Sequence, residues 1–125
     1  MSGYPSSARI YFDSLKNMLE IHPTVIDFKV VRERISESEG FLQVHATLIQ
    51  NCILSAFEYF MKEQGIVRYN YQVMTQDKQL DARWDNVPHH PQLESFPHHR
   101  HSAEGVFESD APTLERILDI FSDFL

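Results

Sequence analysis

Alternating apolar and polar positions dominate the middle of the chain and predict a series of β-strands. In residues 42–48, every second side chain is apolar and the residues between are polar, which is typical of a half-buried strand. Residues 25–30, 67–73 and 80–85 show the same pattern, and residues 53–62 are β-branched and aromatic enough for another strand. Short polar turns separate these segments. Consecutive strands joined by short turns predict an antiparallel meander. A further short strand at Val106-Phe107 would give five to six strands in all.

The two ends of the chain follow a helical period instead. From Ala8 to Ile21 the apolar residues recur at helical spacing, with Ser6 or Ser7 as N-cap and His22-Pro23 as the end. Near the C-terminus, Leu114, Ile117, Leu118 and Phe121 form an apolar stripe; Asp110 is the expected N-cap, and Pro112 suits the first turn. The predicted fold is therefore a single α+β domain over residues 1–125, an antiparallel five- to six-stranded meander sheet flanked by an N-terminal and a C-terminal helix.

One acidic residue lies on an apolar strand face. Glu58 shares its side of the predicted strand with Leu54, Ala56 and Phe60. A buried carboxylate needs a partner, so Glu58 is either a functional carboxylate or one half of an internal ion pair.

Composition narrows the class of protein. No apolar run approaches the roughly 18 residues that a membrane helix needs, and the N-terminus lacks the pattern of a signal peptide. The single cysteine, Cys52, can form no internal disulfide, which favours a cytoplasmic protein. The net charge of −7 argues against a broad nucleic-acid-binding surface.

Five of the seven histidines lie in one proline-rich stretch, Arg83 to His101. The tripeptide Pro-His-His occurs twice, at residues 88–90 and 97–99. Prolines exclude a helix or central strand over most of this stretch, so a stiff loop is expected. The stretch is neutral on an acidic chain, and protonated histidines would make it locally cationic.

Three functions fit such a loop. The first is cleavage of RNA without a metal, in which histidines act as acid and base and arginines hold the phosphate. The candidate catalytic residues are Glu58, Arg83, Asp85, His89, His90, His98, His99, Arg100 and His101. The candidates for binding substrate are Tyr69, Tyr71 and Asn86.

The second possible function is metal binding, and the third is binding of a protein partner without catalysis. His89, His90, His99 and His101, with Asp85 or Glu58, could bind a divalent transition metal such as zinc, nickel or copper, in a hydrolase or nuclease. The RNA-cleavage hypothesis expects no cofactor. Alternatively, the loop binds a protein partner as a non-catalytic interaction module.

The histidine stretch resembles a known family. Arg83-Trp84-Asp85-Asn86-Val87-Pro88-His89-His90, followed by Phe96-Pro97-His98-His99-Arg100-His101, is similar to the signature of the TumE-type toxins of prokaryotic toxin–antitoxin systems. Glu58-Tyr59 and Tyr69-x-Tyr71 fall where that family has an acidic residue and a Tyr-x-Tyr strand, and the likeness covers roughly residues 40–125. Gln50-Asn51-Cys52 departs from the Asp-Gly-Ser-like turn common in the family.

The resemblance implies a small toxin that a cognate antitoxin protein neutralises. It does not define the chemistry, and endoribonuclease activity is inferred from the histidines and arginines together with the common habit of such toxins. RNA is then the expected substrate, no membrane partner is expected, and homo-oligomerisation is left open.

Overall fold

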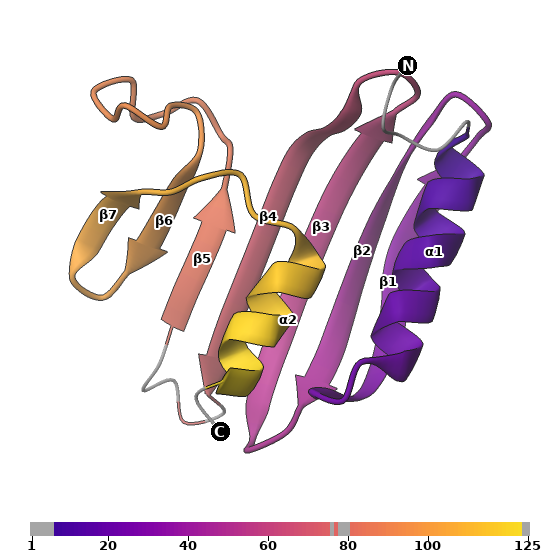
Figure 1. The fold of residues 1–125 in the computed structure, drawn as a ribbon, viewed down its shortest axis with the longest axis horizontal. Helices are drawn as coiled ribbons and strands as arrows, with labels where there is room; N and C mark the ends of the chain where they lie inside the picture. Colours follow the sequence, from indigo (N-terminus) through magenta and orange to yellow (C-terminus); the bar gives the residue numbers. More distant parts are fainter. Residues whose placement is uncertain (1–6, 76, 78–80, 124–125) are drawn as a thin grey trace.

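A computed structural model describes residues 7–75, 77 and 81–123 of the chain. Within them, seven strands form one antiparallel sheet in sequence order, and two helices lie over the same face of that sheet (Figure 1). The elements are α1 (Ala8–Ile21), β1 (Val25–Ile35), β2 (Glu39–Leu48), β3 (Cys52–Met61), β4 (Gly65–Thr75), β5 (Asp81–Asp85), β6 (His99–Ser102), β7 (Gly105–Glu108) and α2 (Leu114–Asp123). The α+β prediction with its antiparallel meander and terminal helices is confirmed.

Helix α1 has the predicted bounds. The Ser7 side chain accepts a hydrogen bond of 3.1 Å from the backbone N–H of Ile10, which satisfies one of the free donors of the first turn. Phe12 and Leu19 are fully buried against the sheet, and the chain turns away at His22, before Pro23. Ser6, the other predicted cap, lies outside the described residues.

The register of the strands defines the two faces of the sheet, because directly paired residues point to the same side. Leu42 pairs with Glu58 and Glu58 with Tyr69; all three are buried on the face that the helices cover. The turn between β2 and β3 lies where the sequence predicted it, with φ near 59° at both Gln50 and Asn51.

Helix α2 begins later than predicted. The expected start directly after Asp110, with Pro112 in the first turn, is wrong: the helix starts at Leu114, and the Thr113 hydroxyl accepts the Arg116 N–H at 3.1 Å. The apolar stripe packs as predicted, with Leu114 and Leu118 buried and Phe121 partly buried at the edge of the core.

The sheet has seven strands rather than five to six. Strand β7 matches the predicted short strand around Val106-Phe107, whereas β6 occupies residues predicted to be loop. β6 was missed because its side chains, His-Arg-His-Ser, are polar on both sides and show no alternation of apolar residues. Among the described residues, neither helix is long and apolar enough to cross a membrane.

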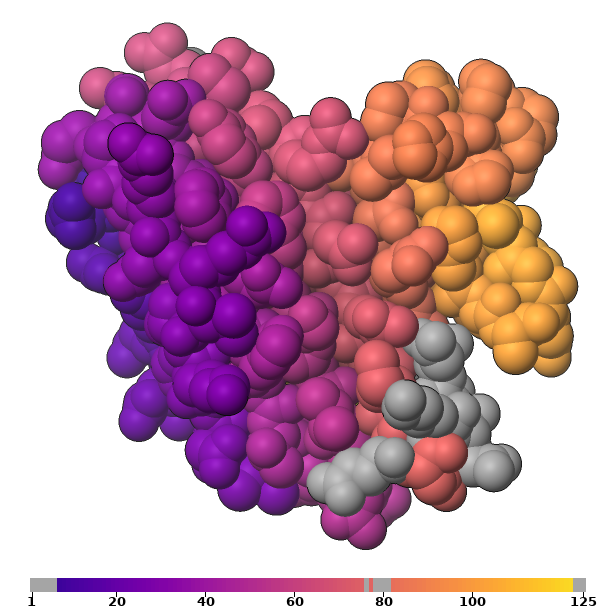
Figure 2. All heavy atoms as spheres, turned by 180° about the vertical axis from the view of Figure 1, so that it is seen from behind, coloured from indigo at the N-terminus to yellow at the C-terminus, as the bar shows by residue number. Residues whose placement is uncertain are grey.

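No helix of the described residues covers the second face of the sheet, which lies opposite α1 and α2 and which we call the open face (Figure 1). Figure 2 looks onto this open face, where residues of β1 to β5 form the surface in colour order from purple to orange.

Candidate functional site

The histidine-rich stretch folds back on itself as two paired strands and a connecting loop. Arg83 pairs with His101, and Asp85 pairs with His99, across β5 and β6. Residues 86–98 form the loop between them. Asp85 also pairs with Asn70 of β4, and the strand neighbours of Asn70, Tyr69 and Tyr71, are buried on the helix side. Asn70 and Asp85 therefore point to the open face. Arg83, His99 and His101 point the same way, because they alternate or pair with Asp85.

Asp85 is the centre of this group. Its carboxylate is buried, with the side chain 4% exposed, and lies 2.8 Å from Nε2 of His99 and 3.6 Å from Nε2 of His101. The Arg83 Nε atom lies 3.2 Å away, an ion-pair contact without hydrogen-bond geometry. The backbone N–H of Val87 donates to the same carboxylate at 3.1 Å and anchors the start of the loop.

His99 is held between two acceptors. Its Nε2 faces the Asp85 carboxylate, and its Nδ1 lies 2.9 Å from the backbone carbonyl oxygen of Pro97. A carboxylate and a carbonyl oxygen both accept hydrogen bonds, and each faces one of the two ring nitrogens. The buried side chains of His99 and Asp85 are in direct contact, and a buried pair of this kind is costly to break.

His101 lies nearer to solvent than His99. Burial lowers the pKa of His101, and repulsion from Arg83 lowers it further, while Asp85 acts in the opposite direction. With 26% of its side chain exposed, His101 is a neutral imidazole near pH 7 that solvent or a substrate can reach.

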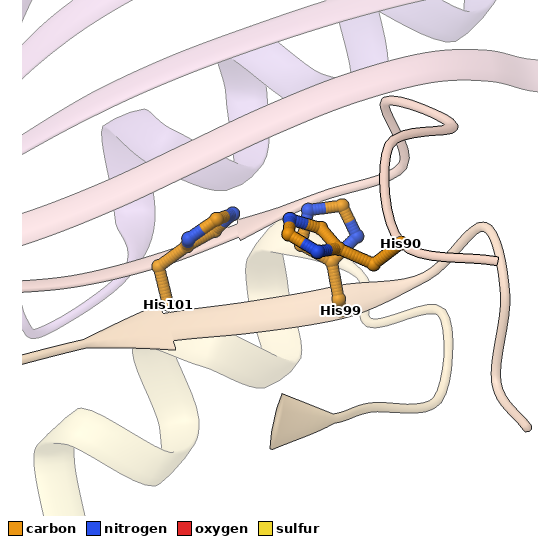
Figure 3. Close-up of side chains that lie close together, drawn as sticks. All are labelled: His90, His99 and His101. Atoms are coloured by element: carbon orange, nitrogen blue, oxygen red, sulfur yellow. The ribbon is translucent and has the colours of Figure 1, made fainter. Parts of the chain in front are cut away.

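The loop adds a third histidine to the same group. The His90 ring reaches over from the loop toward those of His99 and His101 (Figure 3). Its centroid lies 4.9 Å from that of His99 and 5.7 Å from that of His101, both edge-to-face. We call Arg83, Asp85, His90, His99 and His101 the Asp85 cluster.

Three nitrogens of this cluster could hold a metal ion. One ring nitrogen from each of His90, His99 and His101 lies within 4.8 Å of the other two. Zinc with Zn–N bonds of about 2.0–2.1 Å in tetrahedral geometry would bring such atoms to about 3.4 Å. The three rings would have to close in, and His99 would have to release either Asp85 or the Pro97 carbonyl.

Other predicted site residues lie on the helix-covered face. Glu58 is 2% exposed and accepts hydrogen bonds of 2.5 Å from the hydroxyls of Tyr11 and Tyr71. Burial raises the pKa of Glu58, and the two tyrosine hydrogen bonds oppose that rise. The internal ion pair, one of the two alternatives for Glu58, is not what the described residues show: two tyrosine hydroxyls contact the carboxylate. Tyr11 was missed as a partner because a tyrosine at an apolar helix position has the pattern of a core residue.

Arg100 points to the helix side, because it alternates with His99 and His101 along β6. His98, the last loop residue before β6, contacts Tyr69 on the same side. The His98 ring stacks on Tyr69 with 5.8 Å between centroids, and its Nδ1 lies 3.0 Å from the Tyr69 hydroxyl. Burial lowers the pKa of His98, and so does the charge on His99. The Arg100 guanidinium lies 5.0 Å from the centroid of Phe107.

The remaining predicted residues belong to neither group. The Asn86 side chain accepts the Tyr69 N–H at 3.0 Å and donates to the Val67 carbonyl at 3.1 Å, so it fixes the loop to β4. His89 is exposed at the surface of the loop. The structure thus brings Arg83, Asp85, His90, His99 and His101 together and separates Glu58, Tyr69, Tyr71, His98 and Arg100 from them.

The comparison with known families agrees with the signature in the sequence. The model of the family described as Toxin TumE matches residues 15–125, a span that contains the whole sheet, α2 and the Asp85 cluster. No curated protein and no solved structure matches the chain. The chain belongs to the TumE toxin family.

Proposed function

We propose that this toxin is a metal-independent endoribonuclease whose site is the Asp85 cluster. Membership of a toxin family supports a cognate antitoxin as a partner. The observation that supports the chemistry is the contrast between two histidines beside one carboxylate. His99 is buried against the Asp85 carboxylate, whereas His101 is partly exposed and has a lowered pKa that leaves it neutral near pH 7.

RNA cleavage of this kind needs a base, an acid and a cation. The base takes the proton of a 2′-hydroxyl, whose oxygen forms a bond to phosphorus as the bond to the 5′-oxygen breaks. The acid gives a proton to that leaving oxygen. His101 is the base in this proposal because it is neutral and reachable; His90, half-buried at the edge of the cluster, is the acid when protonated.

The other members of the cluster support these two. Arg83 has 39% of its side chain exposed, so its guanidinium can face the negative charge that builds on the phosphorus centre. His99 is 2% exposed and does not reach a substrate; with Asp85 it positions the rings of His90 and His101. His99 and Asp85 are therefore positioning residues.

The test is the pH dependence of RNA cleavage by the purified protein. We expect a bell-shaped rate that a chelator does not change, because one histidine must be neutral and another charged. His101→Ala and His90→Ala should each lower the rate on the order of 10²-fold or more, and Arg83→Lys should also lower it because lysine lacks the planar fork. His89→Ala is the matched control, since His89 is an exposed histidine of the same loop as His90 and lies outside the cluster.

A metal-dependent hydrolase is the second candidate, favoured by the three converging ring nitrogens. It predicts that a chelator abolishes cleavage and that His90→Ala or His101→Ala lowers bound metal and stability together. Purified protein that cleaves no RNA between about pH 5 and 9, with or without divalent metals, would refute both forms and leave a non-catalytic interaction module.

A further inference from the structure

The Asp85 cluster is one end of a row of side chains that crosses the open face. Direct cross-strand pairing links one residue of each strand from β1 to β6, in the order Arg32, Gln43, Phe57, Asn70, Asp85 and His99. The neighbouring row contains Arg34, Phe41, Tyr59 and Arg68 on β1 to β4. Because paired residues share a face, both rows lie on the same surface as the cluster.

At the far end of these rows, two aromatic rings and an arginine form a platform. The Phe41 and Phe57 rings lie 6.1 Å apart on neighbouring strands. The Arg32 guanidinium lies 5.5 and 5.6 Å from their centroids, and its Nε donates to the Gln43 side chain at 2.7 Å. We call Arg32, Phe41 and Phe57 the aromatic platform. An arginine fixed over aromatic rings offers a flat, charged surface on which a nucleobase can stack.

The charge around the platform differs from that of the whole chain. The protein has a net charge of −7, yet Arg32, Arg34 and Arg68 all lie in the two rows, and all three are exposed. The acidic residue nearest in register, Glu39, accepts a hydrogen bond from the Tyr59 hydroxyl at 2.8 Å. A cationic patch beside stackable rings on an otherwise acidic protein is complementary to a single-stranded polyanion with exposed bases.

We infer that the open face binds single-stranded RNA, with a base stacked on the aromatic platform while the scissile phosphate lies at the Asp85 cluster. This rests on the proposed function and adds a substrate class to it: RNA whose bases are unpaired on one side of the cleavage point. Phe57 and His99 are three strands apart, about 14 Å at the usual spacing, so the stacked base is a few nucleotides from the cleaved bond. A duplex buries its bases and cannot stack on the platform in this way.

The test separates binding from cleavage. The probe is a fluorescently labelled, mixed-sequence 12-nucleotide single strand with 2′-deoxy sugars, which lacks the attacking hydroxyl. Its affinity is measured by anisotropy at fixed salt, because phosphate contacts make binding salt-dependent. Phe57→Ala should weaken binding roughly 5- to 100-fold, as expected for the loss of one stacked base.

Conservative and matched variants identify stacking as the cause. Phe57→Tyr should keep the affinity, and Phe57→Leu, which keeps apolar bulk without a π face, should lose it. Phe107→Ala is the control, since Phe107 is an exposed phenylalanine whose pairing with Arg100 places it on the opposite face. Circular dichroism and melting curves establish that each variant is folded.

The outcomes for the two proposals are distinguishable. Binding that Phe57→Ala weakens supports the platform even where the wild-type protein cleaves no RNA. If the cleavage rate and the affinity of Phe57→Ala stay within about twofold of the wild type, the platform is overturned and the nuclease proposal is left intact. Failure of the wild type to bind the single strand also overturns it, as does equal competition by a duplex. If the antitoxin binds over the platform and the oligonucleotide does not compete with it, the platform proposal is also overturned.

Discussion

Replacement of Asp85 by asparagine tests whether one carboxylate organises the cluster. The variant keeps the shape of the side chain and one oxygen but removes the negative charge. In the wild-type protein, the Asp85 carboxylate lies 2.8 Å from His99, 3.2 Å from Arg83 and 3.6 Å from His101. Its loss leaves three cationic or potentially cationic groups close together without a counter-charge.

The expected size follows from burial. The side chains of Asp85 and His99 are 4% and 2% exposed, so solvent screens neither partner. Removal of one member of a buried ion pair costs about 3–5 kcal/mol of unfolding free energy, because the other charge stays buried and unpaired. Activity should fall further than stability explains, by about 10²–10⁴-fold, since His90 and His101 lose the residue that positions them.

The measurement combines urea unfolding at about pH 6, where an ordinary histidine is largely protonated, with RNA cleavage by protein that is still folded. Asp27→Asn is the matched control, because Asp27 is an exposed aspartate on the open face of β1. This expectation is refuted if the unfolding free energies of Asp85→Asn and Asp27→Asn agree within about 0.5 kcal/mol and Asp85→Asn retains the wild-type cleavage rate. In that case the buried pair does not organise the cluster.

Three further results are expected. Expression without the antitoxin should slow growth, and His101→Ala should relieve the effect at equal protein levels; normal growth of cells that contain the wild-type toxin would contradict this. Because burial raises the pKa of Glu58 above its ordinary value of 4.5, the stability that its bound proton supplies is complete below that value and lost as pH rises through the folded-state pKa. Urea unfolding of Glu58→Gln between about pH 4 and 8 should lack this decline, and an unchanged slope would assign it to another group. Truncation after Asp110 removes α2 with buried Leu114, Ile117 and Leu118, worth about 1.5–3 kcal/mol each, so the melting temperature should drop sharply; an unchanged melting curve would make α2 dispensable to the core.

The sequence predicts the scaffold well because its signals are local. Helix α1 has a capping serine, apolar residues at helical spacing and a proline just beyond its end, so its bounds can be predicted. The alternation in residues 42–48 likewise defines both faces of β2. Such patterns depend only on neighbours in the chain.

The site is harder to predict because it depends on alternation in a segment without apolar residues. Five histidines close in sequence suggest one group, yet in β6 the period of two sends His99 and His101 to the open face. His98, the last loop residue before β6, instead stacks on Tyr69 at the other face. The partnership of Tyr11 with Glu58 spans 47 residues, and no spacing rule connects them.

The order of the strands has a consequence for the protein during its synthesis. Each strand pairs with its neighbour in the chain, so the sheet can grow hairpin by hairpin as residues leave the ribosome. The aromatic platform, on β1 to β3, is complete early, whereas the Asp85 cluster needs β6 and therefore residues up to 102. A translating ribosome thus holds a chain with most of its sheet but no assembled histidine cluster, and the residues proposed as the catalytic site come together among the last.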